Sequence, residues 1–197
     1  MTGLNGTSAG GRLLLQAGSS GTGRILAHLT GQVYSSYLWI YASVDAVCEG
    51  TDVLNYQKDV AFVNNAQSYI DLNGCDQEVA SVHWSGYTPT EAARPASPCY
   101  ITSESPATIT FDSLSTDAKK VKVNAIKFTR ATSLHYKAPD TYTLGNVVSD
   151  TTGDLHISDG TLVLQWGAGW RGANAVVDGG VLQLDSTESF KDDSTEL

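Results

Sequence analysis

The sequence predicts an all-β protein: an antiparallel β-sandwich or jelly-roll-like domain that ends in a β-meander of two hairpins. Asp159-Gly160 and Asp178-Gly179-Gly180 each separate two short apolar segments. Asp-Gly between alternating apolar residues is the strongest local signal for a hairpin turn, because a type I′ turn needs positive φ at both central residues. In addition, nothing in the chain shows the apolar period of a long helix. We therefore expect short strands joined by turns.

The two hairpins use expected strands at 155–158, 161–166, 174–177 and 181–184. Before them, Ile25, Ala27 and Leu29 alternate with polar residues, as in a half-buried strand. Further strands are expected at 33–41, 60–63, 68–72, 79–84, 99–102, 107–111 and 121–130. The last of these changes the parity of its apolar positions midway, which predicts a β-bulge near Ala125. This spacing favours a sandwich over alternating strands and helices.

The composition along the chain predicts four regions. Residues 1–23 hold seven glycines and one short apolar segment, Leu13, Leu14 and Leu15, which predicts a flexible arm with one anchoring strand. Residues 24–137 form the main sandwich, and residues 138–187 form the meander, within the same domain or as a small subdomain. Residues 188–197 form an acidic tail. A proline-rich contact loop, with Pro89 and Pro95, is expected at 87–98.

The net charge of −9 is unevenly distributed. Residues 138–197 carry ten acidic and two basic side chains, whereas residues 1–137 are nearly balanced. The acidic total disfavours nucleic-acid binding, which needs positive charge along the phosphate backbone. Six of the twelve bases fall between Lys119 and Lys137. Of these, Lys119, Lys120 and Lys122 either solvate an exposed strand face or dock against an acidic neighbouring subunit.

No sequence motif predicts catalysis, a metal or a cofactor. The segment 18–25 has the glycine spacing of a phosphate-binding loop, but Arg24 and Ile25 replace the lysine and the magnesium-binding hydroxyl. The four histidines are far apart, and the aspartates near 150–159 fit turn chemistry as well as calcium binding. The three cysteines match no zinc spacing and are expected to be free thiols. The chain is therefore predicted to be non-enzymatic.

Aromatic residues give the best candidate contact site. Trp166 and Trp170 lie with Arg171 in a glycine-rich connection, where side chains can project from the backbone. Exposed indole rings stack on sugars, and tryptophan with arginine is also typical of protein interfaces. Trp166 is expected to continue the core alternation and Trp170 to be exposed. Together with Tyr87, these residues are the candidate contact or glycan platform.

A low-charge β protein that is rich in glycine, serine and threonine and has no site chemistry resembles virion structural proteins of tailed bacteriophages. This resemblance implies a capsid decoration or minor capsid subunit that binds copies of itself and other virion proteins. The resemblance also implies that the protein is made in the host cytoplasm and located in the virion, which agrees with the lack of a signal peptide or an apolar membrane segment in the sequence. The assembly contacts would then be Leu13, Leu14, Leu15, Pro89, Pro95, Lys119, Lys120 and Lys122. The alternative is a carbohydrate-binding β-sandwich, either a lectin or a tail receptor-binding module.

Overall fold

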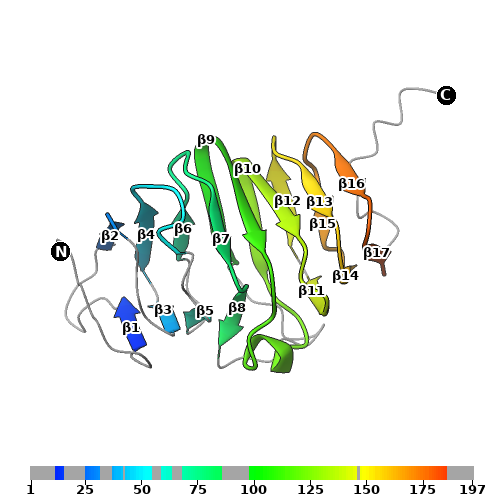
Figure 1. Ribbon diagram of the computed structural model, residues 1–197, viewed down its shortest axis with the longest axis horizontal. Helices are drawn as coiled ribbons and strands as arrows, with labels where there is room; N and C mark the ends of the chain where they lie inside the picture. Colours follow the sequence, from blue (N-terminus) through cyan, green and yellow to red (C-terminus); the bar gives the residue numbers. More distant parts are fainter. Residues whose placement is uncertain are drawn as a thin grey trace.

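The protein is a parallel β-solenoid of about six turns, not an antiparallel sandwich or jelly roll. The computed structural model describes residues 12–15, 25–31, 37–41, 43–54, 59–63, 68–85, 98–145 and 147–185. Within these ranges, each strand pairs in parallel with the strand one coil earlier or later. The chain advances along the long axis of the molecule, from the N-terminal coils at one end to the C-terminal coils at the other (Figure 1).

Each coil contributes strands to up to three faces. Face 1 contains β1 (Arg12–Leu15), β3 (Tyr37–Tyr41), β5 (Val60–Val63), β8 (Val82–Ser85), β11 (Thr141–Gly145), β14 (Thr161–Gln165) and β17 (Val181–Leu184). Face 2 contains β2 (Ile25–Leu29), β4 (Val44–Cys48), β6 (Tyr69–Asp71), the first halves of β9 (Cys99–Phe111) and β10 (Ile126–Tyr136), β12 (Val148–Thr151) and β15 (Gly169–Trp170). Face 3 contains β7 (Gln77–Val79), the second halves of β9 and β10, β13 (Leu155–Ile157) and β16 (Ala175–Val177).

The expected hairpins are corners between faces. Asp159-Gly160 joins β13 on face 3 to β14 on face 1, and these two strands pair with different neighbours. Of the residues in the two expected turns, only Gly160 has a positive φ, of 60°. A type I′ hairpin would require two successive residues in that region. The predicted meander is therefore wrong, because a corner between faces uses the same turn residues as a hairpin.

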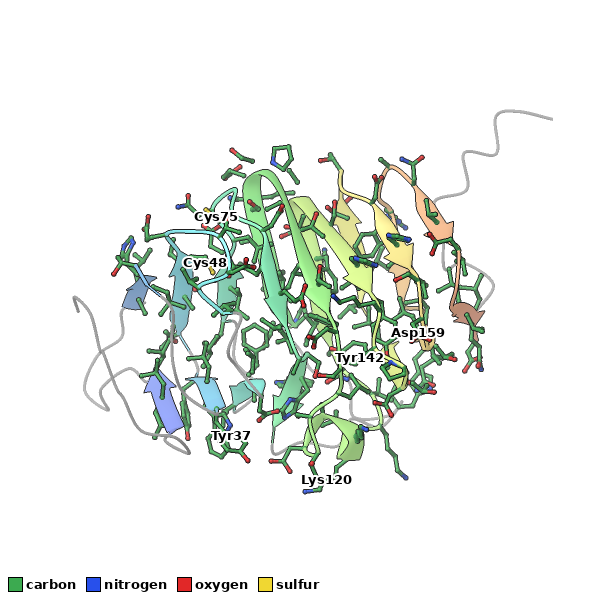
Figure 2. All side chains as sticks on the ribbon, in the orientation of Figure 1. Tyr37, Cys48, Cys75, Lys120, Tyr142 and Asp159 are labelled. Atoms are coloured by element: carbon green, nitrogen blue, oxygen red, sulfur yellow. The ribbon has the colours of Figure 1, made fainter. Side chains whose placement is uncertain are left out.

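Inward side chains stack into continuous columns. On face 1, Tyr142 aligns with Leu162 and Leu182, and Leu144 aligns with Leu164 and Leu184. On face 2, Ile101 aligns with Phe128 in the next coil, and the Phe128 ring contacts the Trp170 ring at 5.4 Å. Figure 2 shows Tyr142 within the body of the solenoid, where its hydroxyl donates a hydrogen bond to the carbonyl of Val82 over 2.5 Å. A single apolar core therefore runs the length of the described coils.

The parity change near Ala125 marks a corner, not a bulge. Val123, Asn124 and Ala125 are all buried where the chain passes from face 1 to face 2. The Asn124 side chain accepts a hydrogen bond from the Trp84 amide at 3.0 Å, and its backbone bridges to Leu144. This asparagine links β8 to β11 across the longest interruption in face 1. Asn124 lies just after the loop that contains η1 (Ala118–Lys120), which is the one helical element of the described residues.

Candidate functional site

The outward surface of face 2 carries a shallow groove of about 500 Å³. It crosses β2, β4, β6, β9 and β10, so its floor is a rigid parallel sheet. The groove is lined by Leu26, Asp45, Val47, Tyr69, Asp71, Tyr100, Thr102, Thr129 and Arg130. The groove combines aromatic, hydroxyl and charged side chains.

Strand register produces this lining. Ala46, Ile70 and Ile101 align across neighbouring strands and point into the core. The residues on either side of each therefore point outward, because successive side chains of a strand alternate between its faces. One outward row contains Asp45, Tyr69, Tyr100 and Lys127, and the next contains Val47, Asp71, Thr102 and Thr129.

A stacked pair of tyrosines forms the centre of the groove. The rings of Tyr69 and Tyr100 lie 4.6 Å apart with an interplanar angle of 9°. Burial, followed by the neighbouring Tyr69 and Cys99, raises the pKa of the Tyr100 phenol. That hydroxyl therefore stays protonated at neutral pH and can donate a hydrogen bond. The pair is a preformed aromatic surface that loses little conformational entropy on binding.

Polar groups lie in the outward row next to the tyrosines. The hydroxyl oxygen of Thr102, a residue only 6% exposed, has no hydrogen-bond partner among the described residues. A buried polar atom without a partner is uncommon and costs free energy, so it marks a position that a ligand or a water can satisfy. Asp71 accepts a hydrogen bond from the Asn73 amide at 2.9 Å, which fixes its carboxylate.

The charges of the groove are arranged as an acidic end and a basic end. Asp45 and Asp71 lie on neighbouring strands and are offset by two positions, which separates such diagonal neighbours by about 7–8 Å. Arg130 lies at the other end and forms an ion pair with Glu104. Its backbone has a φ of 63° at the corner between faces 2 and 3, where its carbonyl accepts a hydrogen bond from the Thr151 hydroxyl at 2.8 Å.

A second polar cluster lies on the outward surface of face 3. The rings of His135 and His156 stack at 4.3 Å. His135 Nε2 lies 2.7 Å from the Ser158 hydroxyl, and His156 Nε2 lies 3.0 Å from Asp178. Burial, followed by the neighbouring His156 and Lys137, lowers the pKa of His135. Ser158 and His135 thus have the spacing of a nucleophile and a base.

A third cluster is buried beneath the loop that precedes η1. Asp59 and His83 are each 1% exposed, with 3.1 Å between the carboxylate and Nδ1. The Ser115 hydroxyl donates its hydrogen bond to Asp59, not to the imidazole. This order cannot relay a proton from serine to histidine, as nucleophilic catalysis requires. The cluster instead fastens the loop to face 1.

Trp166 and Trp170, which were predicted to form a contact platform, do not form one exposed surface. Trp170 is 2% exposed, so the prediction of an exposed ring is wrong. Because the coils here are 20 to 21 residues long, Trp170 aligns with the inward-pointing Ser149 of the previous coil, and its ring packs against Phe128. Trp166 is half-buried in the turn before β15, with a φ of 55°, and Arg171 is exposed. Tyr87, Pro89 and Pro95 lie outside the described residues.

The leucines and lysines predicted to be assembly contacts differ in their exposure and in their partners within the chain. Leu13 and Leu15 align with the buried Leu38 and Ile40 and point inward, whereas Leu14 is 47% exposed. Lys119 pairs with Asp140 at 2.9 Å and Lys120 with Asp117 at 2.6 Å, while Lys122 is exposed. Figure 2 shows Lys120 projecting from η1 at the edge of the molecule. Two of these three lysines are therefore engaged within the chain.

The described ranges carry neither a metal-binding cluster nor a membrane-spanning helix. No group of three or more histidine, cysteine, aspartate or glutamate side chains is arranged to hold a metal ion there. Nor does that part of the chain contain a helix long and apolar enough to cross a bilayer. The three cysteines are free thiols, as predicted.

The groove was missed from the sequence because its residues lie in five separate strands. The outward Asp45, Tyr69 and Tyr100 are separated by 24 and 31 residues and become neighbours only through the solenoid register. The available signal was the repeat of Leu144, Leu164 and Leu184 every 20 residues, which is typical of stacked coils. No protein-family model, curated protein or solved structure matches the chain.

Proposed function

We propose that this protein binds a glycan chain, without turning it over, in the groove on face 2. The observation that carries the proposal is the stacked Tyr69–Tyr100 pair, enclosed by carboxylates and hydroxyls on a rigid sheet. A sugar offers apolar C–H faces together with many hydroxyls. It therefore needs an aromatic contact and both hydrogen-bond donors and acceptors, and this groove contains all three.

The shape and charge of the groove narrow the kind of glycan. The groove crosses neighbouring coils, so an extended chain can lie along the solenoid axis and contact several strands. The two aspartates disfavour a polyanionic chain at the end formed by β4 and β6. We therefore expect a neutral glycan, or one with an amino sugar near Asp45 and Asp71.

The test is binding of the purified protein to a glycan array, followed by calorimetric titration with the strongest hit. Replacing Tyr100 by Ala removes the contact surface and should weaken binding at least tenfold, which is about 1.4 kcal/mol. Lys120→Ala is the matched control, because Lys120 is exposed on η1 outside the groove. Binding that survives Tyr69→Ala and Tyr100→Ala in a folded protein would refute the site, and product release from the glycan would refute the lack of turnover.

A role as a virion structural subunit is the second proposal. It rests on composition and on one structural observation, the exposed apolar residues at both ends of the solenoid. Such ends can join subunits into a shell or tail without catalysis. Detection of the protein in purified virions by mass spectrometry would support it, and its detection only in the soluble fraction of infected cells would oppose it.

A further inference from the structure

The C-terminal end of the described solenoid is an uncovered apolar surface. Leu164 is 1% exposed, whereas Leu184, the next residue in the same inward column, is 47% exposed. Likewise Ile157 is fully buried and Val177, which stacks on it, is 46% exposed. No strand of the described residues pairs with the outer edge of β17. Terminal coils of repeat proteins normally end in a polar cap, which this coil lacks within the described ranges.

At the N-terminal end of the solenoid, the inward columns of face 1 end in residues of β1. β1 pairs with β3, and its other edge has no partner among the described strands. Leu13 and Leu15 point inward from β1, aligned with Leu38 and Ile40. The face 1 columns thus end in leucine at both ends of the solenoid. These ends lie at opposite extremes of the long axis (Figure 1).

We propose that β17 of one molecule pairs in parallel with β1 of a second copy of this chain, so that copies stack head to tail. Val181–Leu184 and Arg12–Leu15 are both four residues long and lie on the same face. Parallel alignment places Leu13 on Leu182 and Leu15 on Leu184. The second copy thereby continues both inward columns and pairs the free edge of β17.

Charge complementarity favours a second copy as the occupant. The described residues before Val44 include no acidic residue and one arginine, Arg12 in β1. The described coils from 147 to 185 contain five aspartates and a single base, Arg171. Head-to-tail contact brings these unlike ends together, whereas contact between two C-terminal ends would place like charges opposite each other. Because the two surfaces differ, the contact is heterologous and can repeat into a filament.

The experiment is sedimentation velocity of the full-length protein over a concentration series at low and high salt. We expect the mean mass to rise beyond that of a dimer with concentration and to fall with salt. Leu184→Asp should give a monomer. Val176→Asp is the matched control: Val176 is also 47% exposed in the last coil but points outward beside His156, so association should persist. Circular dichroism melting curves confirm that both variants are folded.

A mixing experiment tests the polarity of the contact. Leu184→Asp keeps an intact N-terminal end, so adding it to the wild-type protein should stop growth and lower the mean mass. A closed tail-to-tail dimer would exclude this variant and leave the wild-type mass unchanged, which would overturn the proposal. A wild-type protein that is monomeric at every concentration would also overturn it. In that case, association only after removal of residues 186–197 would identify that segment as the occupant.

Discussion

The coils before Ile126 and those after it pack the same kind of core with different coil lengths. After Ile126, aligned residues are 20 or 21 positions apart: Thr141 pairs with Thr161, Thr161 with Val181, and Val148 with Gly169. Before it, the spacing ranges from 19, between Ile25 and Val44, to 32, between Gln77 and Ile109. We refer to these as the regular half and the irregular half.

The corners explain the difference in length. In the regular half, a Cβ at Gly160 would lie 2.0 Å from the Ala138 carbonyl oxygen, and one at Gly153 would lie 2.3 Å from that of Thr132. In the irregular half, a Cβ at Gly50 would meet nothing closer than 3.6 Å, and one at Gly31 nothing within 4 Å. Short coils therefore require tight corners against the backbone of the neighbouring coil. Longer coils relax this requirement, and the groove lies mainly over these coils.

The largest effect expected from a single substitution that tests this comparison is at a tight corner. Gly160→Ala should lower the free energy of unfolding by about 3 kcal/mol, because the methyl group meets backbone atoms at a residue with positive φ. Gly50→Ala should change it by less than about 0.5 kcal/mol. Urea denaturation measures both. Equal losses for the two variants would show that corner packing does not distinguish the halves.

The link between the halves should be the next most sensitive position. Asn124→Ala leaves the buried amide of Trp84 without its acceptor, so we expect a loss of about 1–3 kcal/mol in unfolding free energy. Asn174→Ala removes only an exposed hydrogen bond to Asp154 and serves as the control. Hydrogen exchange should show faster exchange in β8 and β11 of the Asn124 variant. Unchanged exchange there would mean that the two halves are held together elsewhere.

A smaller, pH-dependent effect is expected on the outward surface of the regular half. The pKa of His135 is lowered by burial and by His156 and Lys137, against the opposing effects of Asp178 and Glu78. The unfolded chain therefore binds a proton more readily, and stability should fall as the pH drops through about 6.5. His135→Asn should reduce the decrease in melting temperature between pH 7.5 and 5.5. A parallel decrease in the variant would assign the pH dependence to another group.

The smallest effect concerns the thiols, all of which lie in the irregular half. Burial raises the pKa of Cys99 to about 12 and raises that of Cys48 further. Both should react slowly with a thiol reagent at pH 8, while Cys75, which is partly exposed, should react first. Mass spectrometry of the labelled native protein counts the modified residues. Rapid labelling of all three would show that the irregular coils open readily.

Much of the strand content could be predicted locally. The expected strands at 60–63 and 181–184 coincide with β5 and β17, and those at 99–102 and 107–111 lie within β9. Alternating apolar residues predict single strands, and glycine or aspartate between them predicts a turn. These patterns do not show whether a turn is a hairpin or a corner that leads to the next face of a solenoid. The pairing of the strands and their relative direction were therefore predicted incorrectly.

The sequence by itself determined an all-β chain of short strands, free cysteines and an acidic C-terminal region. Only the tertiary structure decided that the strands are parallel, that Trp170 is buried and that Tyr69 stacks on Tyr100. The physical reason is that these features depend on coil register. A spacing of 20 residues aligns one column and a spacing of 31 residues aligns another, and the contacts that select each spacing are long-range.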